Sequence, residues 1–102
     1  MAQPKINLTP KAEEDLREIF DYLSNFSLNA ADVKIGRILD KIDLLIQFPR
    51  IGRVVEHYKN QQLREFPVGS YVVAYYIVSE IQIDILSIHH SSQSSELHFS
   101  EE

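Results

Sequence analysis

The sequence predicts an α+β fold in which two antiparallel helices pack against one face of an antiparallel sheet. Apolar residues recur at helical spacing in two consecutive segments between residues 10 and 48, which is typical of amphipathic helices. From residue 63 onwards the apolar residues are mostly β-branched or aromatic and are interrupted by short turn signals, which indicates strands. Helical and strand segments are thus separated along the chain, an order that predicts an α+β domain.

The first predicted elements are a strand at residues 5–8 and a helix from Pro10 to about Phe26. Thr9 suits the N-cap position, and Pro10 suits the first helical position because its missing N–H would be unpaired there anyway. The acidic run at residues 13–15 favours the positive end of the helix dipole, and we interpret it as a solvated helix start. The apolar stripe of this helix consists of Ala12, Leu16, Ile19, Phe20 and Leu23.

A second helix is predicted from about Asn29 to Phe48, where Pro49 ends it. The short break at residues 27–29 makes the two helices antiparallel neighbours, a helical hairpin. The wider apolar stripe of the second helix consists of Val33, Ile35, Ile38, Leu39, Ile42, Leu45 and Ile46.

Three further strands are predicted at residues 63–66, 71–78 and 81–88, and the short connections between them predict an antiparallel meander. Residues 67–70 read as a tight connection. The segment 71–78 is apolar at both odd and even positions, which indicates a central strand covered on both faces.

The composition indicates one folded domain, with 44% hydrophobic and 25% charged residues in a chain of 102. We expect the domain to span residues 1–92 and residues 93–102 to form a polar tail. The chain has no cysteine, no apolar run of membrane-spanning length and no apolar stretch of signal-peptide length at its N-terminus, so we expect a cytoplasmic protein without membrane contact.

The charge argues against direct nucleic-acid binding. The formal net charge is −5, and both halves are acidic: residues 1–49 carry six basic and eight acidic side chains, and residues 50–102 carry four and seven. Proteins that bind nucleic acids gain much of their affinity from Lys and Arg on phosphates, and this sequence lacks that surplus.

The order of elements, together with four short strings, resembles the ParE/RelE toxin superfamily of type II toxin–antitoxin systems. The resemblance spans roughly residues 5–92. The strings are LTPKAEEDL at residues 8–16, FPRIGR at 48–53, LREFPVGSY at 63–71 and ILSIHH at 85–90. This resemblance implies a fold made of a strand, a helical hairpin and a three-strand meander. It also implies a cognate antitoxin as partner.

The resemblance also implies two branches of activity on one fold. A RelE-like toxin cleaves messenger RNA in the ribosome without a metal, whereas a ParE-like toxin inhibits DNA gyrase and is not known as a hydrolase. RNA cleavage requires several Arg or Lys side chains converging on one phosphate, together with proton-transfer groups. The predicted strands between residues 63 and 88 carry only Arg64 against Glu65, Glu80 and Asp84. We therefore favour the ParE-like branch, with DNA gyrase as target and no catalytic activity; a RelE-like ribosome-dependent endonuclease and a non-toxic binding module of the same fold are the alternatives.

The candidate target-binding residues are Arg64, His89, His90, Ser91 and Ser92. For Arg64 the alternative is an exposed strand residue in an ion pair with Glu65 or Asp84. For His89 the alternative is a hydrogen bond to backbone at the end of the strand. Adjacent strand residues point to opposite faces, so His89 and His90 are not expected to converge on one phosphate. The four histidines lack a zinc-like spacing, and we expect no metal and no other cofactor.

The hairpin offers more apolar surface than one small sheet is expected to cover. A large exposed apolar patch marks an interaction site, and we expect an amphipathic helix or strand of the antitoxin to dock along it. A homodimer that buries the same surface is the alternative. The candidate antitoxin-binding residues are Phe20, Leu23, Phe26, Ile35 and Leu39.

Overall fold

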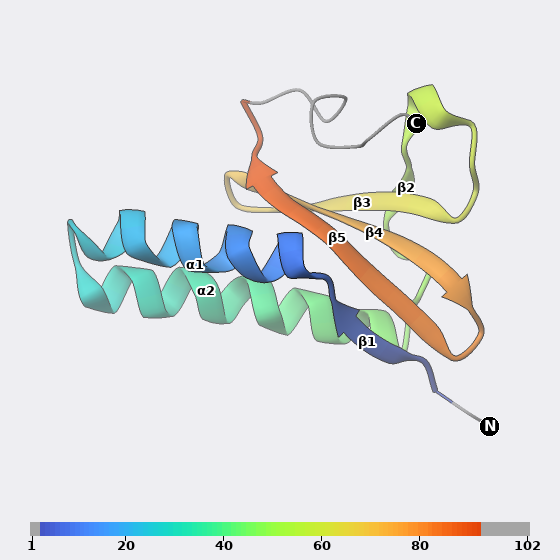
Figure 1. Ribbon diagram of the computed structural model, residues 1–102, viewed down its shortest axis with the longest axis horizontal. Helices are drawn as coiled ribbons and strands as arrows, with labels where there is room; N and C mark the ends of the chain where they lie inside the picture. The colour runs from blue at the N-terminus through green and yellow to red at the C-terminus, as the bar shows by residue number, and fades with distance from the viewer. Residues whose placement is uncertain (1–2, 93–102) are drawn as a thin grey trace.

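The computed structural model describes residues 3–92, and it confirms the α+β class (Figure 1). The predicted tail at residues 93–102 lies outside the described residues. The elements in chain order are β1 (Lys5–Leu8), α1 (Pro10–Ser24), α2 (Leu28–Asp43), the 3-10 turn η1 (Leu44–Ile46), β2 (Arg53–Val54), the 3-10 turn η2 (Glu56–Tyr58), β3 (Leu63–Val68), β4 (Tyr71–Ser79) and β5 (Gln82–His90).

The strands form one sheet in the order β1-β5-β4-β3-β2. The predicted antiparallel meander of β3, β4 and β5 is confirmed. Two features go beyond the prediction. β1 pairs parallel with β5, and the two-residue β2, which the sequence did not indicate, extends the sheet beside β3.

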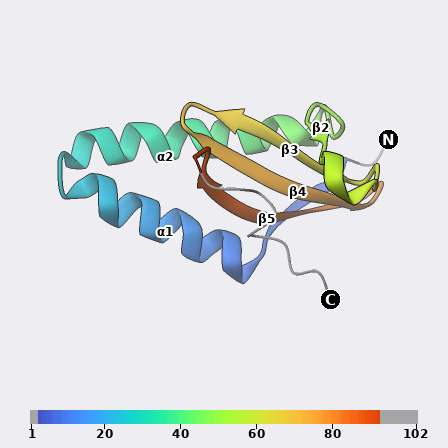
Figure 2. The same ribbon diagram turned by 90° about the horizontal axis from the view of Figure 1, so that it is seen from above.

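The helices form the predicted hairpin, and its turn projects past the sheet, as Figures 1 and 2 show. Thr9 and Ser27 cap the two helices by accepting hydrogen bonds from Ala12 N and Ala30 N. The core lies between the hairpin and the sheet. Its most buried members include Ile38 and Leu45 on the helical side; on the strand side they are Val73, Tyr75, Ile83 and Ile85.

Several predicted boundaries are corrected. α1 ends at Ser24, and α2 ends at Asp43 before the tighter turn η1. β3 continues through Pro67, which still faces Val72 of β4. A proline is tolerated there because β2 ends earlier, so this stretch of β3 is an edge. Only Gly69, with φ of +60°, and the residue after it form the turn into β4.

The prediction that β4 is covered on both faces is only half right. β4 is the central strand, and its helix side is buried at Val73, Tyr75 and Ile77. On the other side, Ala74 is buried but Val78 is 46% exposed. We call this side the helix-free face; by strand register it also carries Glu65 of β3 and Ser87 of β5.

Candidate functional site

The start of α1 is fixed to β5 by two side chains. Thr9 Oγ1, besides capping the helix, donates to the carbonyl oxygen of Ile85 at 2.7 Å. Asp15 Oδ2 accepts from the backbone N–H of Ile88 at 2.9 Å. Since β1 pairs with β5 only as far as Ile85, the carboxylate satisfies an amide that the sheet would leave unpaired.

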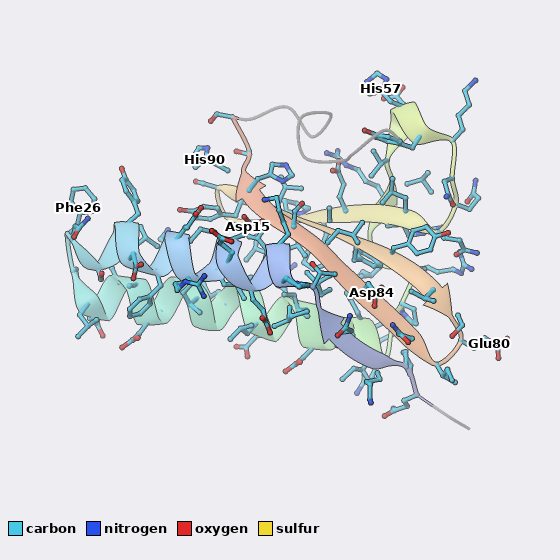
Figure 3. All side chains as sticks on the ribbon, in the orientation of Figure 1. Asp15, Phe26, His57, Glu80, Asp84 and His90 are labelled. Atoms are coloured by element: carbon cyan, nitrogen blue, oxygen red, sulfur yellow. The ribbon has the colours of Figure 1, made fainter. Side chains whose placement is uncertain are left out.

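The interpretation of residues 13–15 as a solvated helix start is wrong for Asp15. Glu13 and Glu14 are exposed as expected, but Asp15 is only 8% exposed. Its other oxygen accepts from Lys11 Nζ at 2.8 Å. The helical period turns position 15 towards the end of β5, where Figure 3 shows its side chain.

The two histidines that end β5 point to opposite faces of the sheet, as the sequence predicted. His89 is buried and pairs in register with Val72 on the helix-free face. His90 is exposed and pairs with Tyr71, with the two rings edge-on at 5.6 Å between centroids. His90 Nδ1 accepts from the backbone N–H of Ser92 at 3.1 Å, so a neutral His90 ring carries its proton on Nε2.

A groove of about 590 Å³ lies between α1 and the end of β5. Tyr22 and Leu23 of α1 line it on one side, and His89, His90 and Ser92 line it on the other. The structure therefore brings three candidate target-binding residues beside one candidate antitoxin-binding residue. A ligand in this groove would contact both sets at once.

The groove is lined by neutral polar groups as well as charged ones, and Tyr71 is one of the neutral groups. Burial, and to a smaller degree the charge of Tyr22, raises the pKa of Tyr71 above its usual value of 10, so its phenol is protonated at neutral pH. Ser91 does not line the groove; its backbone N–H donates to the carbonyl oxygen of Ser70, a lining residue, at 2.7 Å.

Arg64 does not join the other candidate target-binding residues. It pairs in register with Tyr75, four positions along β4 from the Tyr71–His90 pair, which is roughly 13 Å along the strand. Its guanidinium donates to the carbonyl oxygens of Gln61 at 2.8 Å and Gly52 at 2.9 Å. Arg64 thus fixes the loop that follows α2.

The alternative expected for Arg64, an ion pair with Glu65 or Asp84, is not the arrangement found. Glu65 accepts from Nε and Nη2 of Arg53, at 3.1 and 2.9 Å. Asp84 accepts from the side-chain amides of Asn7 and Gln82, at 3.1 and 2.8 Å. Both acids are therefore engaged by neighbours on the helix-free face.

Tyr75 also holds the loop that follows α2, and its ring is fully buried beneath this loop in the core. Its hydroxyl donates to Pro49 O at 2.7 Å and accepts from Gly52 N at 3.0 Å. Burial raises the pKa of Tyr75, against the opposing effects of the Gly52 hydrogen bond and of the nearby Arg64 and Arg50. Gly52 is required by contact, since a Cβ there would lie 2.8 Å from Glu65 O and from the Tyr75 ring.

The helix-free face does not gather positive charge. In the five strands, the cations on this face are Arg53 on β2 and Lys5 on β1, and these strands form opposite edges of the sheet. Arg53 is matched by Glu65, and Oε1 of that buried carboxylate accepts no hydrogen bond within residues 3–92. Buried Ser87 Oγ is likewise without a partner in that part of the chain.

The five candidate antitoxin-binding residues differ in exposure. Phe26, at the hairpin turn in Figure 3, is 74% exposed, and Leu39 is 38% exposed. Phe20 is half-buried. Leu23 and Ile35 are half-buried and pack against the core. The antitoxin assignment stays a prediction, for which Phe26 and Leu39 are the accessible members.

No cluster of three or more His, Asp or Glu side chains is arranged to hold a metal ion within the described residues, 3–92. No helix in that range is both long and apolar enough to cross a membrane.

Comparison with known proteins gives a family match and several similar folds. The model of the family described as the ParE toxin of the type II toxin–antitoxin system parDE matches residues 6–95. No curated protein matches. Among solved structures, the chromosomal ParDE system of P. aeruginosa is similar with a TM-score of 0.70 at 20% identity, over 86% of this chain and 96% of that one.

Two structures of RelE-type proteins share the fold as well. The toxin–antitoxin complex RelBE2 of Mycobacterium tuberculosis is similar with a TM-score of 0.64 at 16% identity, over 87% of this chain and 99% of that one. An arginine-substituted mutant of the E. coli toxin RelE in the free state is similar with a TM-score of 0.65 at 14% identity, over 93% of this chain and 90% of that one.

Proposed function

The chain belongs to the ParE toxin family of type II toxin–antitoxin systems, and we propose that it arrests growth by binding DNA gyrase in the cytoplasm. The proposed inhibition is a protein–protein interaction, without a cofactor and without cleavage of nucleic acid. A cognate antitoxin neutralises the toxin by covering part of its surface.

We favour gyrase over RNA as the target because of the distribution of charge on the helix-free face. Stabilising the transition state of phosphodiester cleavage requires several preorganised donors or cations aimed at one phosphate. The strands place Arg53 and Lys5 at opposite edges and use Arg64 to hold a loop. A buried carboxylate, Glu65, lies beside Arg53. This surface favours a protein target over a phosphate backbone.

An antitoxin partner is supported by the groove beside α1 and by the exposed apolar residues of the hairpin. The similar ParDE and RelBE2 structures come from systems in which a toxin and an antitoxin occur together. The groove of about 590 Å³ and the exposed Phe26 offer an amphipathic segment both an apolar contact and polar walls.

The decisive experiment is a supercoiling assay. Purified toxin is added to DNA gyrase holoenzyme, ATP and relaxed plasmid, and supercoiled product is measured. We expect inhibition, and in cells we expect filamentation with DNA damage on regulated expression. A prompt halt of translation with normal supercoiling would instead support the RelE-like function, and normal growth would support a non-toxic binding module.

A further inference from the structure

The loop after α2 exposes a compact group of apolar side chains. Phe48 is 54% exposed, Ile51 is 53% exposed and Leu44 is 39% exposed. Backbone hydrogen bonds from Phe48 N to Leu44 O at 2.8 Å and from Ile51 N to Phe48 O at 3.1 Å keep the three residues in consecutive turns. Apolar residues scattered singly over a surface are normal, whereas a group of them on one loop indicates an interaction site.

This loop is held in one conformation by two side chains. Tyr75 bonds Pro49 and Gly52, as described above, and Arg64 Nη1 donates to Arg50 O at 3.2 Å and to Gly52 O at 2.9 Å. A surface loop fixed in this way loses little further conformational entropy when a partner binds. The buried Tyr75 of β4 and Arg64 of β3 thus support a loop whose apolar side chains face solvent.

The loop also lies in the one basic region of the second half of the chain. From residue 50 onwards all four Lys and Arg side chains fall within residues 50–64, namely Arg50, Arg53, Lys59 and Arg64. The acids within residues 43–65 are Asp43, Glu56 and Glu65. Residues 18–33 around the hairpin turn, by contrast, carry three acids and no Lys or Arg.

The apolar loop is separate from the hairpin turn. The two lie at opposite ends of α2, whose sixteen residues span about 24 Å. The turn has exposed Tyr22 and Phe26 within residues 18–33, which carry three acids and no Lys or Arg, whereas the loop has Phe48 and Ile51 beside Arg50. Two surfaces of opposite charge suit two different partners.

Resting on the proposed function, we propose that Phe48, Ile51 and Arg50 form the surface by which the toxin grips its target protein, and that the matching target surface is acidic around an apolar pocket. Charge complementarity selects the partner: in a protein of net charge −5, Arg50 places a positive charge beside the two apolar side chains, which favours an acidic surface around an apolar pocket. The two apolar side chains are the anchors, and Arg50 sets the orientation and the salt dependence.

The test compares the double variant Phe48→Ser/Ile51→Ser and the variant Arg50→Glu with two matched controls. The controls are Ile81→Ser, an exposed apolar residue at the β4–β5 turn, and Arg17→Glu, an exposed charge reversal on α1. All five positions are exposed, and thermal midpoints within about 2 °C of the parent establish that each of the four variants folds. The readouts are growth arrest in cells without antitoxin, and inhibition of purified gyrase at 50 and 200 mM salt.

We expect the loop variant to weaken both readouts by roughly tenfold or more, which is typical of removing central interface anchors. Arg50→Glu weakens inhibition mainly at low salt, and both controls leave it unchanged. If gyrase is inhibited equally by the loop variant, the proposal is overturned while the gyrase function stands.

If the parent spares gyrase but arrests growth, the gyrase function fails, and growth alone decides the proposal: relief of arrest in the loop variant supports it, and unchanged arrest overturns it. A nucleic-acid partner would appear as binding of a plain DNA duplex that Arg50→Glu abolishes and the loop variant retains. That outcome would also overturn the proposal.

Discussion

At the scale of single residues, Tyr75 joins the core to the surface loop. Its ring fills the space between the sheet and the hairpin, and its hydroxyl bonds Pro49 O and Gly52 N. Tyr75→Phe keeps the ring but leaves a buried amide and a carbonyl without a partner, which costs about 1–3 kcal/mol of unfolding free energy. Urea unfolding measures the loss, with Tyr22→Phe, a ring 60% exposed, as control. Equal stabilities of the parent and Tyr75→Phe would show that water replaces the phenol at no cost.

The raised pKa of Tyr75 predicts a loss of stability in alkali. The unfolded chain releases the phenolic proton near pH 10, whereas the folded state holds it to higher pH. The stabilisation is therefore complete below about pH 10 and declines as the pH rises through the folded pKa. Thermal midpoints between pH 8 and 11 should fall less steeply in Tyr75→Phe than in the parent. Some decline remains, because the pKa of Tyr71 is also raised. An unchanged slope would mean that Tyr75 is not the group responsible.

The burial of Asp15 could not be predicted from the sequence. A run of three acids in the first turns of a helix favours the helix dipole whether or not the side chains are buried. Only the short length of β1 leaves Ile88 N without a strand partner and gives Asp15 a buried role. That information lies 73 residues away in the chain.

At the scale of elements, the hairpin carries the expected antitoxin surface. Replacing the two accessible residues, in Phe26→Ser/Leu39→Ser, removes apolar area that is 74% exposed at Phe26 and 38% exposed at Leu39. We expect the toxin to remain folded and the cognate antitoxin to bind at least about tenfold more weakly. Titration calorimetry of the complex measures the change. Ile81→Ser, an apolar residue 61% exposed at the β4–β5 turn, is the control. Full affinity in the hairpin variant would move the antitoxin to another surface.

The existence and order of the main elements followed from local patterns, but the faces of β5 did not. Strict alternation beyond Ile83 and Ile85 would put later odd positions on the helix side as well. In the structure the register shifts between Ala74 and Tyr75, so the core position after Ile85 is Ile88. This irregularity puts Ser87 and His89 on the helix-free face. A bulge of this kind depends on the partner strand, and the sequence of one strand does not reveal it.

At the scale of the whole molecule, strand order decides where the charges lie. The sequence predicted the meander but not the placement of β1 beside β5, nor the existence of β2. These two edge strands carry Lys5 and Arg53. The sequence left open whether Arg50, Arg53 and Lys59 fold over the sheet. In the structure Arg53 pairs with Glu65, and Arg50 bonds Gln62 in the loop region.

That separation of charge predicts that the protein has no intrinsic ribonuclease activity. Four strand spacings divide Lys5 from Arg53, about 19 Å, so the two cannot contact one phosphate. Each missing donor at such a centre costs on the order of a hundredfold or more in rate. His89 and His90, on opposite faces, cannot act together as acid and base. The measurement is to incubate purified toxin, free of antitoxin, with programmed ribosomes and to map messenger 5′ ends, with E. coli RelE as positive control. Codon-dependent cuts that disappear in Arg53→Ala or His90→Ala would place the chain among the RNA-cleaving toxins.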